Sequence, residues 1–139
     1  DENAGFTDGT PWLAMNPNYR QINVREQEAR TDSVLAYYRR LVHLRKADAY
    51  RETFTYGIFE PAYQEMADVF AYYRVSGESG QRILVAANFG TDAVSLPLAY
   101  PCRQVLLSNL RAESAVETAC KKTNTLTLES CEVAVIELG

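Results

Sequence analysis

The pattern of short apolar segments and turns after Ala49 constrains the fold more than any other feature of the sequence. The hydrophobic period there changes to two, which is typical of half-buried β-strands. Short strands separated by turn residues, with no helix between them, favour an antiparallel sandwich over a parallel sheet. The segments expected to form strands are 52–63 (interrupted by Gly57 and ended near Pro61), 68–75, 81–89, 93–98, 102–110, 125–130 and 133–138.

One helix precedes this region. Thr31, Asp32 and Ser33 supply side chains suited to an N-cap, and apolar residues follow at helical spacing. Basic residues gather in the second half of the segment, where they suit the negative end of a helix dipole. We predict a helix from about Asp32 to about Ala47. Its apolar stripe consists of Val34, Leu35, Tyr38, Leu41 and Val42.

The segment before this helix has no regular period. Residues 3–24 read NAGFTDGTPWLAMNPNYRQINV and contain two Pro and two Gly, yet they also carry large rings such as Phe6 and Trp12. Long polar loops seldom hold such rings, so we expect this arm to pack against another surface.

Composition bounds the class of protein. With 139 residues, 47% hydrophobic content and a net charge of −4, the sequence predicts a folded globular chain that binds neither nucleic acid nor a membrane surface. No apolar run approaches the ~20 residues needed to span a bilayer. The N-terminus lacks the features of a signal peptide and an initiating Met, so we expect the chain to begin inside a longer gene product.

The cysteines indicate the compartment. Cys102, Cys120 and Cys131 are odd in number and lack the spacing of a metal site. We expect three reduced thiols in a cytoplasmic protein. A Cys102–Cys131 disulfide would instead argue for export.

No residue pattern predicts catalysis. His43 is the only histidine and lies within the predicted helix, and motifs for nucleotide binding, zinc proteases or a nucleophilic serine do not occur. Glycoside hydrolysis needs two facing carboxylates, and no acidic pair stands in a suitable context. The sequence therefore predicts no catalytic, cofactor-binding or metal-binding residue and no cofactor.

The aromatic residues permit two interpretations. Nine Tyr, five Phe and one Trp are enough for a sugar-stacking surface, as in a carbohydrate-binding module. However, rings such as Phe54, Tyr56, Phe70 and Tyr72 lie in segments that alternate like strands. Core packing is therefore favoured.

Several motifs resemble a known family. The arm contains NAGFT, PW, NPNY and INV (residues 3–7, 11–12, 16–19 and 22–24), and DSVLAYYRRLVHLRK follows. These resemble the last barrel loop and helix of α-glucosidases of glycoside hydrolase family 13. The most similar group is that of oligo-1,6-glucosidase, dextran glucosidase and trehalose-6-phosphate hydrolase. Residues 82–89 (RILVAANF) and 132–138 (EVAVIEL) resemble strands of the C-terminal β-domain.

The resemblance implies a mainly β fold. Residues 1–48 would be the end of the catalytic (β/α)8 barrel, a loop plus its last helix. Residues 49–139 would be the C-terminal antiparallel β-sandwich. Phe6, Trp12 and Tyr19 would pack on barrel residues absent from this chain. The family's catalytic carboxylates belong to earlier barrel strands, so no catalytic residue is carried over, and residues 110–125 fit the family poorly and are expected to form a variable loop.

The implied function is that of a non-catalytic piece of a retaining α-glucosidase acting on short α-glucosides. The implied partners are the rest of the barrel and, for the whole enzyme, an oligosaccharide substrate. Bond specificity (α-1,6, α-1,4 or trehalose 6-phosphate) stays open. The alternative is a carbohydrate-binding β-sandwich, which exposed coplanar aromatics on one sheet face would favour. The apolar stripe and the arm also predict self-association of the chain.

Overall fold

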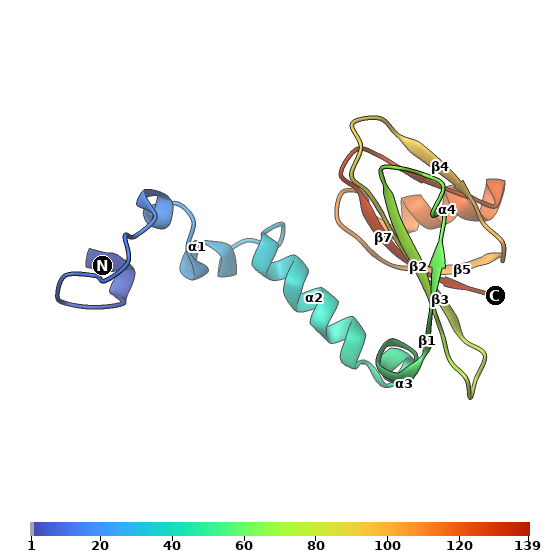
Figure 1. The fold of residues 1–139 in the computed structure, drawn as a ribbon, viewed down its shortest axis with the longest axis horizontal. Coiled ribbons are helices and arrows are strands. Elements are labelled where there is room, and N and C mark those ends of the chain that lie inside the picture. The colour runs from blue at the N-terminus through green and yellow to red at the C-terminus, as the bar shows by residue number, and fades with distance from the viewer. Residues whose placement is uncertain (1) are drawn as a thin grey trace. The chain divides into compact units, whose positions relative to one another are not determined.

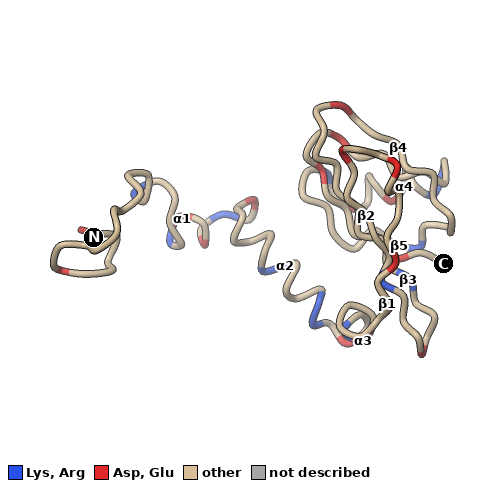
Figure 2. Tube along the Cα trace, in the orientation of Figure 1, with Lys and Arg blue, Asp and Glu red and all other residues tan. Residues whose placement is uncertain are grey.

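The structure, a computed structural model, describes residues 2–139 and consists of two compact units (Figure 1). Contacts within the chain group Asp1–Arg40 and Leu41–Gly139, and each unit is described by itself. Charged residues of both signs are scattered along the trace (Figure 2). The domain division predicted after residue 48 stays a prediction.

The first unit is made of short helical turns joined by irregular chain. It contains the 3-10 helices η1 (Glu2–Gly5) and η2 (Pro17–Arg20), the helix α1 (Val24–Glu28) and the start of α2 (Val34–Lys46). The predicted cap of α2 is confirmed: the Ser33 hydroxyl oxygen accepts from the Ala36 N–H at 3.1 Å. A side chain that satisfies a free N–H fixes where a helix begins, which is why the prediction was accurate here.

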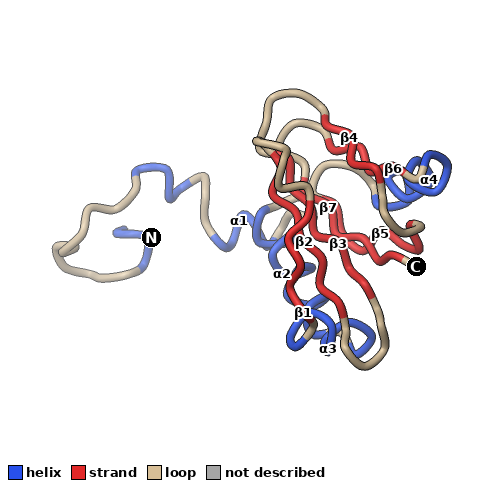
Figure 3. The backbone as a smooth tube through the Cα atoms, turned by 45° about the vertical axis from the view of Figure 1, so that its right-hand side comes forward, coloured by secondary structure: helices blue, strands red, loops and turns tan. Residues whose placement is uncertain are grey.

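The second unit is built on antiparallel sheets, as predicted (Figure 3). One sheet has the order β1-β2-β3-β7-β5, and β4 pairs with β6 in a separate ribbon. Strands β2 and β3 form a hairpin, and the turn between them holds Gly80 at a φ of 71°. The strands are β1 (Ile58–Ala62), β2 (Val69–Val75), β3 (Arg82–Asn88), β4 (Val94–Pro97), β5 (Cys102–Ser108), β6 (Thr125–Leu128) and β7 (Val133–Leu138).

The hydrophobic core of this unit joins the five-stranded sheet, the β4–β6 ribbon and the helix α4 (Glu113–Thr123). Alternate residues of the strands point into it, because successive side chains of a strand face opposite sides. Each large apolar side chain buried there contributes about 1.5–3 kcal/mol. Its largest fully buried members are Leu84, Leu96, Leu126, Leu128, Ile136, Val116 and Cys120.

The structure corrects the expectation of a strand over residues 52–63. The first part forms a helix, α3 (Asp48–Tyr56), and only the part after Gly57 forms β1. The rings of Tyr50 and Phe54 are four residues apart and meet edge to face, with centroids 6.4 Å apart. Side chains at this spacing lie on one face of a helix. The alternation of Thr and aromatic residues resembles the pattern of a strand. Contacts with the sheet nevertheless stabilise the helix, since the Arg74 guanidinium donates to the Phe54 carbonyl at 3.3 Å.

A second correction concerns residues 110–125, expected to form a loop with no helix between the strands. They contain α4, whose buried side chains Val116 and Cys120 are four residues apart on the core side. The Lys121 ammonium pairs with Glu117 one turn earlier, at 2.6 Å. Asn124 ends the helix in the left-handed conformation, with a φ of 51°. In the sequence, Val116 and Cys120 do stand at helical spacing, but this pattern extends over only one turn.

The aromatic residues expected in the core are only partly there. Phe54 and Tyr72 are partly buried, but Phe70 is 56% exposed and Tyr56 is 80% exposed. The prediction was wrong for these last two rings. Tyr56 is the last residue of α3, and Phe70 lies on the sheet face opposite the core, so the alternation of side chains placed it away from the packed layer.

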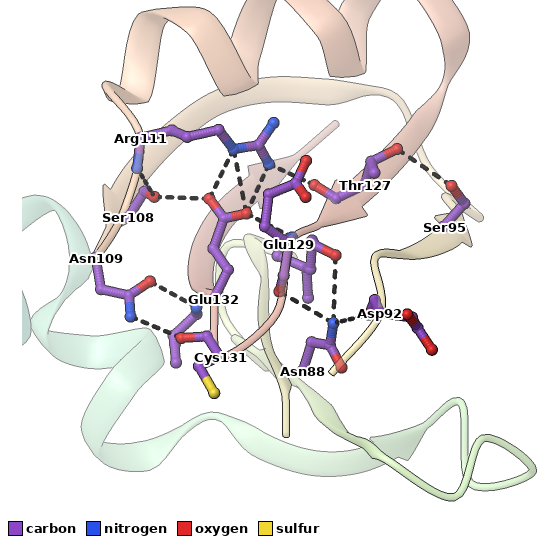
Figure 4. Close-up of polar contacts among 12 residues, drawn as sticks. Asn88, Asp92, Ser95, Ser108, Asn109, Arg111, Thr127, Glu129, Cys131 and Glu132 are labelled. Carbon is purple, nitrogen blue, oxygen red and sulfur yellow. Dashed lines mark hydrogen bonds and ion pairs between the residues drawn. The ribbon is translucent and has the colours of Figure 1, made fainter. Parts of the chain in front are cut away.

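A buried ion pair closes the end of the second unit (Figure 4). Glu132 is fully buried, and its carboxylate accepts from the Arg111 guanidinium at 2.8–3.1 Å. The Ser108 hydroxyl and the Glu129 N–H donate to the same carboxylate at 3.1 and 2.8 Å. Nearby, the Asn88 amide donates to carbonyls of the β6–β7 region and of Asp92. The polar groups of this end are thus satisfied by one another.

These contacts also set the charge state of Glu132. Desolvation by burial pushes its pKa upward, but the hydrogen bonds from Arg111, Glu129 and Ser108 outweigh this, and the pKa lies below its ordinary value of 4.5. A lowered pKa in the folded state means stability that is present above the unfolded pKa and is lost as the pH falls through the folded value.

We therefore expect Glu132→Gln to lower the free energy of unfolding at pH 7 by about 3 kcal/mol, because it leaves Arg111 without its counter-ion. The wild-type protein should also lose stability as the pH falls below about 4.5, and the variant should lose less. Urea unfolding at a series of pH values measures both effects. Glu78→Gln, in the β2–β3 turn, is the control and should behave as wild type. Equal acid sensitivity of Glu132→Gln and wild type would contradict this account.

Candidate functional site

The first unit carries the motifs that the sequence singled out, and their asparagines shape the backbone. The Asn3 amide donates to the carbonyls of Thr7 and Gly9, both at 3.0 Å. Asn3 and Ala4 themselves adopt positive φ values of 53° and 54°. This conformation is uncommon for residues other than glycine. The NAGFT motif therefore forms a tight turn that its own side chains hold closed.

The next two asparagines act as helix caps. Asn16 accepts from the Asn18 N–H at 3.2 Å and begins η2. Asn23 accepts from the Glu26 N–H at 3.0 Å and begins α1, while its amide donates back to the Tyr19 carbonyl at 3.1 Å. These are the residue types that satisfy the free N–H groups of a first helical turn. The NPNY and INV motifs are thus locally determined structures.

Between these turns lies an open hollow of about 840 Å³. Its lining mixes apolar side chains with polar ones, as small-molecule sites do. The Arg20 guanidinium lies 5.7 Å from the centroid of the Tyr19 ring and donates to its hydroxyl at 3.3 Å. The lining includes Phe6, Met15, Asn16, Asn18, Tyr19, Arg20, Ile22 and Asn23.

The hollow lacks the groups of a glycosidase. Among the described residues that line it, Glu26 is the one carboxylate. Asp32, further along, pairs with Arg30 at 3.0 Å, and this hydrogen bond lowers the pKa of Asp32, the opposite of what a general acid needs. Over residues 2–139 no three His, Cys, Asp or Glu side chains gather as a metal site would require. Retaining glycosidases use two facing carboxylates, and the described lining of the hollow holds one.

The large rings of the arm are uncovered. Trp12 is 92% exposed and Phe6 is 81% exposed, while Tyr19 is partly buried. On α2, Val34 and Tyr38 are 79% and 62% exposed. Rings of this size are seldom left in water without a partner surface.

A second apolar surface lies on the face of the five-stranded sheet opposite the core. At its β1–β2 edge Phe59 and Phe70 are half exposed, and Tyr72 lies between them. The Phe59 and Tyr72 centroids are 4.8 Å apart with planes inclined by 30°, and Phe70 meets Tyr72 edge to face at 5.7 Å and 62°. We call these three rings the edge cluster. Its rings are neighbours, but they are not coplanar.

The sequence predicted no site residue, and it missed the edge cluster. Alternation showed that Phe70 and Tyr72 share a face, but which face is covered depends on α4 and the β4–β6 ribbon. No helix among the described residues has both the length and the apolar character needed to cross a membrane.

Comparison with known proteins gives the family. Residues 1–57 match the family model described as alpha amylase, catalytic domain. The chain is 37% identical over 116 residues to the glucan 1,6-alpha-glucosidase of Streptococcus pneumoniae, covering 84% of this chain and 21% of the relative. It is 35% identical over 120 residues to the oligo-1,6-glucosidase of Parageobacillus thermoglucosidasius, covering 84% and 20%.

A solved structure agrees with these relatives. Isomaltulose synthase from Klebsiella sp. LX3 superposes with a TM-score of 0.80 and 30% identity, covering 100% of this chain and 24% of that one. The chain spans about a fifth of the length of the curated relatives it matches. The motifs, the fold and these matches agree: residues 1–57 match the alpha-amylase catalytic-domain family, and the chain is related over most of its length to α-glucosidases.

Proposed function

We propose that the chain is a non-catalytic, C-terminal part of a retaining α-glucosidase that hydrolyses short α-glucosides in the cytoplasm. The observation that carries this proposal is the exposure of Phe6 and Trp12 in a segment that matches a catalytic-domain model. A catalytic domain contains a partner surface for such rings, and the relatives are about five times longer than the matched region. The relatives' names support an oligosaccharide substrate.

The arm has a definite role in this proposal. Its caps and turns hold the hollow open without help from the second unit. The arm would supply the rim of the substrate pocket, with Tyr19, Arg20 and the asparagines facing sugar hydroxyls. The two catalytic carboxylates would come from the rest of the barrel.

The second unit has a supporting role. Its edge cluster offers an apolar surface to the barrel, and burying each ring there would contribute about 1.5–3 kcal/mol. The alternative function, a carbohydrate-binding module, is favoured by the exposure of the same rings. Sugar-stacking sites present rings as a flat surface, and the inclination of 62° between Phe70 and Tyr72 favours a docking role.

We expect the 139-residue chain to hydrolyse no glucoside, because the carboxylate pair of the reaction is missing from the hollow. Incubation with p-nitrophenyl α-glucoside and with isomaltose tests this, beside the complete gene product as the positive control and a heat-denatured sample as the blank. Turnover by the chain above that blank, with contaminating enzyme excluded, would overturn the proposal.

Substitutions in the edge cluster separate the two functions. We expect Phe59→Ser and Phe70→Ser to lower the thermal midpoint of the complete enzyme while changing the unfolding of the isolated chain little, because the rings are already exposed there. Leu110→Ser, an exposed apolar residue next to the opposite edge strand β5, is the matched control. Calorimetry measures the midpoints. If wild-type chain binds insoluble α-glucan and Phe70→Ser does not, the module interpretation is correct instead.

The isolated chain should also self-associate. Pairing with a second copy removes the exposed apolar side chains of the arm and α2 from water. These side chains are exposed because the chain is separated from the barrel. We expect Leu41→Glu and Trp12→Ser to shift sedimentation toward monomer, and His43→Gln, on the same helix, to leave it unchanged. A wild-type chain that stays monomeric at high concentration with an ordered arm would contradict this prediction.

A further inference from the structure

Two of the three cysteines meet in the core of the second unit, where neither the sequence nor the proposed function assigns them a role. Cys102 begins β5 and is 7% exposed, and Cys120 lies in the last turn and a half of α4 and is 1% exposed. Both belong to the same buried cluster, and each thiol acts on the pKa of the other.

Contacts on either side fix this juxtaposition. The Val105 N–H donates to the Glu117 carboxylate at 3.0 Å. Val105 lies three residues after Cys102, and Glu117 lies three residues before Cys120. At the other end of the helix, Asn124 exchanges two hydrogen bonds of 3.0 Å with the backbone of Leu98. The helix therefore runs antiparallel to the segment 98–105, and Cys120 is held opposite Cys102 between two anchored points.

Cys131 is not a partner for Cys102 in this arrangement. Cys102 pairs with Leu138 at one end of β7, whereas Cys131 precedes the other end and is exposed. A strand rises about 3.3 Å per residue, so the two ends lie roughly 17 Å apart. A disulfide needs Cα atoms closer than about 7 Å. The Cys102–Cys131 pair considered from the sequence is thus excluded by distance.

We propose that Cys102 and Cys120 are a dithiol site that oxidises to a disulfide and so locks α4 onto β5. Oxidised glutathione is a sufficient oxidant. The Cys102 thiolate attacks one sulfur of it and releases one glutathione thiolate, and the Cys120 thiolate then displaces the second glutathione from Cys102. The protein gives up two protons and two electrons, and one glutathione disulfide becomes two glutathione thiols.

The surroundings set the order and the speed of these steps. Burial raises the pKa of Cys102, and burial together with the neighbouring thiol raises the pKa of Cys120 to about 11. Glu117, Lys121 and Arg111 are the charged groups that act on the pair. Cys102 is the more exposed thiol, and a bulge interrupts the β5–β7 ladder directly after it. Attack should therefore begin at Cys102, be slow at neutral pH and accelerate as the pH rises.

The full chain is incubated in glutathione buffers from fully reduced to fully oxidised, then alkylated, cleaved with trypsin and mapped without reductant. Cleavage after Arg103, Arg111 and Lys121 separates the three cysteines. We expect oxidation to block both buried thiols and to link peptide 83–103 to peptide 112–121, while the exposed Cys131 takes up only glutathione. Cys131→Ser, the matched control, should form the same link, and Cys120→Ala should carry glutathione on Cys102 instead.

Hydrogen exchange supplies a readout that does not depend on any variant. Oxidation of wild type should slow exchange of the α4 amides, and a thiol reductant should reverse this. Free thiols at both buried positions after full oxidation of the buffer would overturn the proposal, as would a link to Cys131. Neither outcome depends on glucosidase activity, so this experiment and the tests of the proposed function can fail independently of each other.

Discussion

The fully buried carboxylate of Glu132 is the constraint around which the end of the second unit is organised. Removing a charge from water costs several kcal/mol, so the surrounding chain must supply hydrogen bonds and an opposite charge in place of the lost water. Arg111, the Ser108 hydroxyl and the Glu129 N–H do so (Figure 4). Arg111 also donates to the Thr127 carbonyl at 2.5 Å. One carboxylate thereby ties the end of β5 to the ribbon strand β6 and to the turn before β7.

This closure holds a covering layer against the core face of the sheet. On the opposite face Ile83 and Ala87 are buried too, and the edge cluster lies at the β1–β2 edge. The ribbon and α4 are held against the core face at both ends, by Glu132 at one and by Asn124 at the other. The opposite face needs no such covering within the chain at its β1–β2 edge. Its exposed rings, like those of the arm, are the surfaces that the proposed function assigns to contact with the rest of the barrel.

The structure was most predictable where local interactions decide it. The start of α2 followed from Ser33, and all strands from β2 to β7 appeared where alternation placed them. The helix α3 was mistaken for a strand because Thr and aromatic residues alternate there, and its stabilising contacts come from Arg74 and other residues of the sheet. The helix α4 was missed because only two of its side chains, Val116 and Cys120, mark the core side.

The sequence by itself determined the family motifs, the capped helix and the antiparallel character of the sheet. These depend on residues close together in the chain, whose spacing is visible directly. Only the tertiary structure decided that Cys102 meets Cys120, that Arg111 neutralises Glu132 and that Phe59, Phe70 and Tyr72 gather on an uncovered face. These pairings follow from strand order and from the layer that covers each face, and both arise from contacts between residues far apart in sequence.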